Sequence, residues 1–159
     1  TYQTNIVVGD YHFFLSHQSG FIGRVNLVTD LVEYLQVPLQ IIRNMKTKDS
    51  QILPDRTIPN DMKNADGFLA TQDKRNAGSG WGHVSAASPT VVGQYMYLPT
   101  MVGTVFVLKW KSPKLDAQAL ISISDLGSAG QTWTLSSLAY SKGRLYARTL
   151  KELICIEAK

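Results

Sequence analysis

The chain has 159 residues, of which 44% are hydrophobic, enough for one domain with a substantial core. Its net charge of +4 comes mostly from isolated lysines and arginines, which argues against the dense basic stripe of a nucleic-acid-binding domain. No run approaches the roughly 18 apolar residues of a membrane-spanning helix. We therefore expect neither a nucleic-acid partner nor a membrane span.

The first 38 residues read as four short strands separated by turns. Gly9-Asp10 stands between two β-branched or aromatic runs, and glycine reaches the positive φ of a two-residue hairpin turn without steric cost. Leu31 to Leu35 also has helical spacing, but Pro38 ends a helix nearby, so we expect a strand there. The four expected strands are 5–8, 11–15, 21–27 and 31–38.

Residues 43–80 interrupt this pattern with a polar segment rich in Pro, Asn, Asp and Gly. Loops this long are uncommon in compact domains and are usually functional or disordered, so we interpret the segment as an insertion. It ends in SGWGHVS, where glycines flanking Trp81 let a ligand approach the ring, and His83 can exchange a proton near neutral pH. The candidate ligand-binding residues are Trp81 and His83, with Arg75 and Asn76 from the same insertion. The alternative is structural, with Trp81 filling a seam between sheets and His83 bonded to a backbone carbonyl.

Two further strand-rich stretches follow the insertion, centred on the turns Gly93-Gln94 and Lys142-Gly143. Aligned on these turns, both stretches match residues 5–27 as imperfect copies of a strand-turn-strand-turn-strand unit. Repeats of roughly 40 to 50 residues with four strands each are typical of β-propeller blades. The expected strands are 90–92, 95–100, 104–108 and 120–123 in the second copy, and 136–140, 144–149 and 153–156 in the third.

The last two copies also resemble a known family of repeats. The closing hairpin GRLYARTLKELICIE and the segment SPTVVGQYMYLPTMVGTVFVL both resemble strands of PQQ-like (quinoprotein alcohol dehydrogenase-like) propeller blades. The resemblance is weaker over residues 5–27 and absent between about 43 and 80. It implies an all-β fold: a partial β-propeller of about three antiparallel blades, with a long polar insertion between the first and the second.

The expected organisation is a blade-like unit at 1–42, an inserted loop region at 43–87, and two further units at 88–159, all within one domain. Complete propellers have roughly four to eight blades. The remaining blades are therefore expected from the same protein or from another chain.

The resemblance leaves two functions open. In the first, a non-catalytic scaffold binds a protein, peptide or glycan partner through its interblade loops and needs no cofactor. In the second, the chain is part of a pyrroloquinoline-quinone-dependent alcohol or sugar dehydrogenase, with PQQ and Ca²⁺ in an axial pocket. Many such enzymes carry vicinal cysteines, whereas this chain has one cysteine, and we favour the scaffold. The resemblance also implies a periplasmic or extracellular location.

Other chemistries find little support in the sequence. His12, His17 and His83 occur without the G-x-S-x-G nucleophile elbow, and no third zinc ligand is marked near His12 and His17. We predict no catalytic or metal-ligating residue. Cys155 lies in an apolar run and is expected to be a small buried side chain, and Trp133 is expected to fill a junction between blades.

Overall fold

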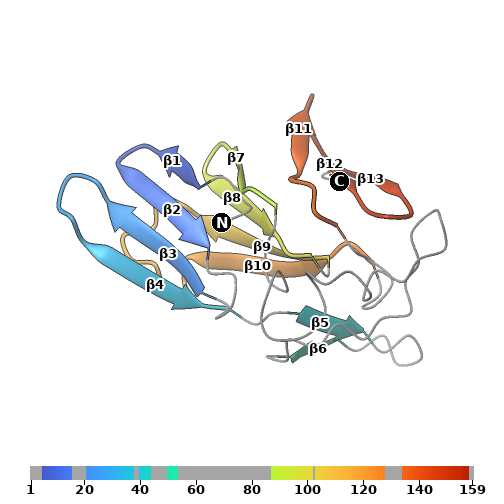
Figure 1. The fold of residues 1–159 in the computed structure, drawn as a ribbon, viewed down its shortest axis with the longest axis horizontal. Coiled ribbons are helices and arrows are strands. Elements are labelled where there is room, and N and C mark those ends of the chain that lie inside the picture. Colours follow the sequence, from blue (N-terminus) through green and yellow to red (C-terminus); the bar gives the residue numbers. More distant parts are fainter. Residues whose placement is uncertain are drawn as a thin grey trace.

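The computed structural model describes residues 5–15, 21–37, 40–43, 50–53, 87–101, 103–127 and 134–157. All secondary-structure elements assigned among these residues are β-strands (Figure 1). The strands are β1 (Ile6–Val8), β2 (Tyr11–Leu15), β3 (Phe21–Asn26), β4 (Val32–Gln36), β5 (Gln40–Arg43), β6 (Ser50–Leu53), β7 (Thr90–Val92), β8 (Tyr95–Pro99), β9 (Thr104–Lys109), β10 (Leu120–Asp125), β11 (Ala139–Ser141), β12 (Arg144–Arg148) and β13 (Leu153–Glu157).

The strands form three antiparallel sheets and one separate hairpin. The first sheet has the order β1-β2-β3-β4, the second β7-β8-β9-β10 and the third β11-β12-β13, while β5 pairs with β6. The fold is therefore all-β, with successive antiparallel sheets arranged as blades of a partial β-propeller (Figure 1). The strands predicted in the three repeat copies are confirmed, including β4, for which helical spacing was the alternative.

The same two-residue turn opens each sheet. Gly9 and Gly93 have φ values of 55° and 58°, and in the third sheet Lys142 and Gly143 have φ values of 48° and 81°. Glycine favours this left-handed region because it has no Cβ to clash with the backbone. Since the turns occupy equivalent places, they align the three sheets residue by residue, and Phe13, Tyr97 and Tyr146 become equivalent positions.

This alignment gives each sheet two named faces. The front face carries Phe13, Tyr97 or Tyr146, and the back face carries the next residue along the strand, because side chains alternate across a β-sheet. The front face of the first sheet packs on the back face of the second in one large cluster. The front face of the second packs on the back face of the third in a smaller cluster built around Val105, Leu138 and Ala147. The second sheet is therefore covered on both faces by its neighbours.

Two outer faces remain without a described neighbour. One is the back face of the first sheet, where Tyr34 is 61% exposed. The other is the front face of the third sheet, where Leu153 is 72% exposed. Cys155 lies on the front face of the third sheet and is exposed, so the prediction of a buried thiol is wrong. Its strand is apolar, as expected, but no described sheet covers that face.

The segment after β9, residues 110–119, is rich in polar side chains, yet part of it is buried. Trp110, Leu115 and Ala119 are all buried in the cluster between the first two sheets. Residue 43, where the expected insertion begins, is the last residue of β5. The division of the chain into 1–42, 43–87 and 88–159 otherwise stays a prediction.

Candidate functional site

The ligand-binding residues predicted from the sequence, Trp81, His83, Arg75 and Asn76, lie outside the described residues. Trp133, expected between two blades, also lies outside them. The described residues build three other features that bear on function: a tryptophan bridge, a buried ion pair, and a cavity between the second and third sheets.

Trp110 bridges the first and second sheets. It follows β9, its indole Nε1 donates to the carbonyl of Gly93 at 2.9 Å, and Gly93 lies in the β7–β8 turn of the same sheet. A Cβ built on Gly9, in the β1–β2 turn of the first sheet, would lie 3.0 Å from the Trp110 ring. The Trp110 ring therefore covers the β1–β2 turn of the first sheet, while its Nε1 donates to the equivalent β7–β8 turn of the second sheet. This is the junction role that the sequence predicts for Trp133.

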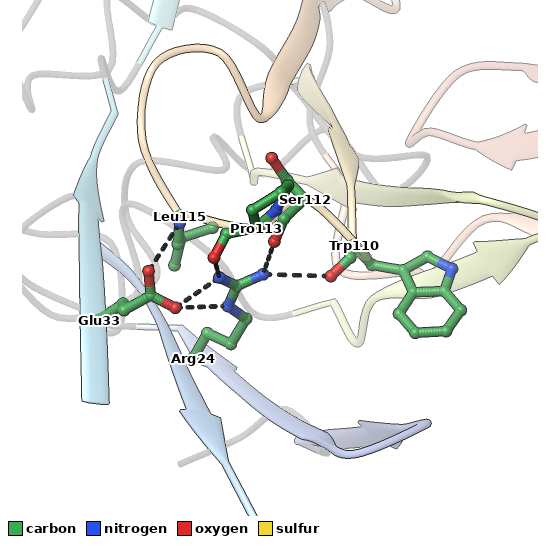
Figure 2. Close-up of polar contacts among 6 residues, drawn as sticks. All are labelled: Arg24, Glu33, Trp110, Ser112, Pro113 and Leu115. Atoms are coloured by element: carbon green, nitrogen blue, oxygen red, sulfur yellow. Dashed lines mark hydrogen bonds and ion pairs between the residues drawn. The ribbon is translucent and has the colours of Figure 1, made fainter. Parts of the chain in front are cut away.

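The buried ion pair of Arg24 and Glu33 joins the same two sheets (Figure 2). Arg24 and Glu33 face each other across β3 and β4, and Arg24 is 1% exposed. The guanidinium donates to Glu33 and to three backbone carbonyls after β9: Trp110 at 3.3 Å, Ser112 at 2.6 Å and Pro113 at 3.4 Å. The other Glu33 oxygen accepts the N–H of Leu115 at 2.9 Å.

These contacts use the full donor capacity of Arg24. An arginine has five N–H groups, and here two point at Glu33 and three at carbonyls. The Tyr11 ring lies 4.4 Å from the guanidinium carbon and covers one of its faces. Since no donor is left over, the pair holds the loop of the second sheet against the first and is not available to a ligand.

A cavity of about 360 Å³ lies between the second and third sheets. Its walls are mostly apolar or aromatic, with serines of β10 at one side and the end of β13 at the other. The lining residues include Tyr97, Val107, Ser122, Ser124, Tyr140 and Ile156. Cavities of this size, with apolar walls and a few polar groups, are common binding sites.

Burial raises the pKa of Tyr97 above its ordinary value of 10.0, and the nearby phenols of Tyr95 and Tyr140 add to the shift. The hydroxyl therefore remains a neutral donor on the cavity wall at physiological pH. Glu157 at the rim is bonded to Arg144, whose Nε lies 3.1 Å from a carboxylate oxygen, and this bond raises the pKa of Arg144. The cavity presents phenols and hydroxyls around an apolar surface.

His12 lies on the back face of the first sheet and is half-buried. Its ring centroid is 6.1 Å from that of Phe14, which meets Tyr34 edge to face at 5.9 Å. These contacts place His12 in a row of aromatic side chains.

The carboxylates whose contacts are described are bonded to donors of the chain itself. Glu33 is bound by Arg24, Glu157 by Arg144, and Asp116 accepts the N–H of Gln118. Ca²⁺ prefers several converging oxygen ligands. In the ranges that the structure describes, no three His, Cys, Asp or Glu side chains gather in a metal-binding arrangement. The same ranges contain no helix long and apolar enough to cross a membrane.

The sequence carried a usable signal for the ion pair. Arg24 and Glu33 are single opposite charges on two apolar strands joined by a short turn, so antiparallel pairing brings them together. Trp110 gives a weaker signal, because it stands between two lysines in a polar stretch of the sequence.

No protein-family model matches the chain, and no curated protein sequence matches it significantly. Among solved structures, the crystal structure of BamB from Moraxella catarrhalis is similar over 96% of this chain and 41% of that chain, with 14% sequence identity and a TM-score of 0.35. The chain thus spans about two fifths of the length of that structure.

Proposed function

We propose that the chain is part of a non-catalytic, PQQ-like β-propeller scaffold that binds a partner protein. The observation that carries the proposal is the apolar cavity between the second and third sheets, which opens beside the edge strand β13. A groove with phenols, hydroxyls and aliphatic side chains suits a polypeptide better than a charged metabolite.

The buried charges support a structural role for the polar residues. Arg24 and Glu33 satisfy each other and the backbone of the neighbouring sheet, so they fix how two blades pack. A rigid stack of sheets can hold loops and edges in fixed positions for a partner. The interblade insertion with Trp81, His83, Arg75 and Asn76 is proposed as a second contact with the partner, on sequence grounds alone.

Site-specific photo-crosslinking tests the scaffold function. A photoreactive amino acid at Tyr140, on the cavity wall, or at Trp81 is expected to crosslink one defined protein in the organism of origin. The control position is Val28, which is 73% exposed in the β3–β4 turn of the first sheet and does not line the cavity. If all three positions give the same products, or Tyr140 and Trp81 give none, the proposal fails.

The second candidate is a quinoprotein dehydrogenase, favoured by the family resemblance of the closing hairpin. It predicts dye-linked oxidation of alcohols or sugars once PQQ and Ca²⁺ are added to the protein. We expect no such activity, and turnover at ordinary enzyme rates would favour the dehydrogenase. A periplasmic or extracellular location is proposed from the same resemblance.

A further inference from the structure

The two faces that meet between the first and second sheets carry almost only apolar side chains. On the back face of the second sheet, the strand residues that enter this contact include Val91, Met96, Leu98, Phe106, Leu108 and Ile123. Hydrophobic contacts between such faces have little direction. The apolar faces alone would therefore leave several relative positions of the two sheets close in free energy.

Arg24 and Glu33 are the exception on the opposing front face of the first sheet. Arg24 lies between Phe13 and Glu33 across neighbouring strands, so the charged pair sits within the apolar face. Its partners in the second sheet are backbone groups of the loop after β9, namely the carbonyls of Trp110, Ser112 and Pro113 and the N–H of Leu115 (Figure 2). Because hydrogen bonds are directional, this set forms in only one position of the loop relative to the first sheet.

The equivalent positions of the second sheet show that the fold does not require charges there. Val107 is the equivalent of Arg24 and Ser122 the equivalent of Glu33, since Tyr97 pairs with Val107 and Val107 with Ser122. Val107 packs against the cluster that joins the second sheet to the third. A sheet of this chain can therefore pack through neutral residues where the first sheet carries an arginine and a glutamate.

A buried charge makes the free energy of packing depend strongly on position. A buried arginine that is paired and fully hydrogen-bonded is often close to neutral for stability, whereas one that loses its partners is strongly unfavourable. Any displacement of the first sheet that breaks the contacts of Arg24 carries that penalty. The penalty limits a displaced packing to roughly one molecule in a hundred or fewer.

We propose that the Arg24–Glu33 pair is a positioning device that excludes displaced packings of the first sheet on the second. In this role the pair contributes a single arrangement of the two sheets more than it contributes net stability. The role is independent of the scaffold function and of any partner. Replacing both residues by apolar side chains of similar length should leave the protein folded while allowing more than one arrangement of the two sheets.

Trp110 reports on this arrangement, because its ring contacts both sheets. Its Nε1 donates to the carbonyl of Gly93 in the second sheet, and the ring lies against Gly9 of the first. A displacement of one sheet along the other therefore changes the surroundings of the ring. Fluorine NMR of the protein labelled with fluorotryptophan observes the three tryptophans separately, and the variant Trp110→Phe identifies the Trp110 signal.

The deciding variant is Arg24→Met/Glu33→Leu. We expect one sharp Trp110 signal in the parent protein. In the double variant we expect at least two signals, or one signal broadened by exchange, with roughly one tenth of the molecules or more in the minor arrangement, because the penalty of about a hundredfold is absent.

Two controls separate this role from a loss of stability. Leu108→Val removes a methylene group from the same core and leaves the charged pair intact, so it should lower stability and keep a single Trp110 signal. Arg24→Lys keeps a positive charge opposite Glu33 but has three N–H donors where arginine has five. It too should lower stability and keep a single signal, because a displaced packing still buries an unpaired charge.

The proposal is overturned if the double variant gives one sharp Trp110 signal at every temperature, as the parent does. It is also overturned if the double variant does not fold, because the pair is then required for stability itself. Splitting of the signal in either control has the same consequence, since several arrangements would then occur while the buried charge is still present.

Discussion

At the scale of single residues, the structure depends on the buried charge of Arg24. Arg24 is 1% exposed, and its five N–H groups all meet acceptors from the chain. Burying an ion pair costs desolvation energy, which close geometry and additional hydrogen bonds offset. Loss of one partner leaves the other charge buried without compensation, so the two residues should behave as a unit.

Arg24→Met is predicted to lower the free energy of unfolding by about 3 kcal/mol, since three backbone carbonyls lose their donor and the partly buried Glu33 carboxylate loses its counter-charge. Glu33→Leu should cost a similar amount. The double variant Arg24→Met/Glu33→Leu should cost clearly less than the sum of the two, because it leaves no unpaired charge. Urea denaturation of the four proteins measures this coupling. Additive losses would show that the pair does not act as a unit.

Tyr97 gives a prediction about alkaline pH. Burial raises its pKa above 10.0, so the folded state holds the phenolic proton more tightly than the unfolded chain does. This contribution to stability is complete below pH 10 and is lost as the pH rises through the folded-state pKa. Tyr97→Phe should therefore lose less stability than the parent chain above pH 10. The difference in phenolate absorbance between the parent chain and Tyr97→Phe should show the Tyr97 phenol titrating above pH 10.0, and its titration at or below pH 10.0 would contradict the assignment.

At the scale of elements, two hairpin turns offer a matched pair. Gly9 and Gly93 have nearly the same φ, but a Cβ on Gly93 meets nothing within 4 Å whereas one on Gly9 meets Trp110. Gly93→Ala should cost about 1 to 2 kcal/mol from the left-handed backbone alone. Gly9→Ala should cost about 1 kcal/mol or more beyond that, because the Trp110 ring must move. Thermal unfolding of both variants measures the difference in stability. Equal losses of stability would mean that the Trp110 ring moves aside without a cost in free energy.

The strands could be predicted from the sequence because alternation and turn chemistry are local. The Gly9-Asp10 and Gly93-Gln94 turns set the register, and the apolar runs beside them could pair in few other ways. Burial in the connections could not be predicted, since it depends on which sheet lies opposite. Trp110 is buried because the first sheet covers it, whereas Cys155 is exposed because no described sheet does.

The candidate site was predictable to a smaller extent. The choice of Trp81, His83, Arg75 and Asn76 followed from composition in a polar segment and stays a prediction. The cavity could not be found in this way, since Tyr97, Ser122 and Ile156 come from strands of two different sheets. Only the stacking of the second sheet on the third brings these side chains together.

At the scale of the whole molecule, the two junctions between sheets are unequal. The first and second sheets share a large cluster that includes Phe13, Met96 and Phe106, reinforced by the Arg24–Glu33 pair. The second and third sheets share a smaller cluster, a bond from the Thr90 hydroxyl to the Leu138 carbonyl, and the cavity of about 360 Å³. Local stability follows the burial of apolar contacts, so the third sheet should open more readily than the first two.

Hydrogen exchange under native conditions tests this inequality. Amides of β12 should exchange through an opening of lower free energy than amides of β2, β3, β8 and β9, which should open together because one core joins them. Mass spectrometry of peptic fragments at increasing urea separates the two groups. One common opening energy for all three sheets would show that the third sheet does not open separately from the first two.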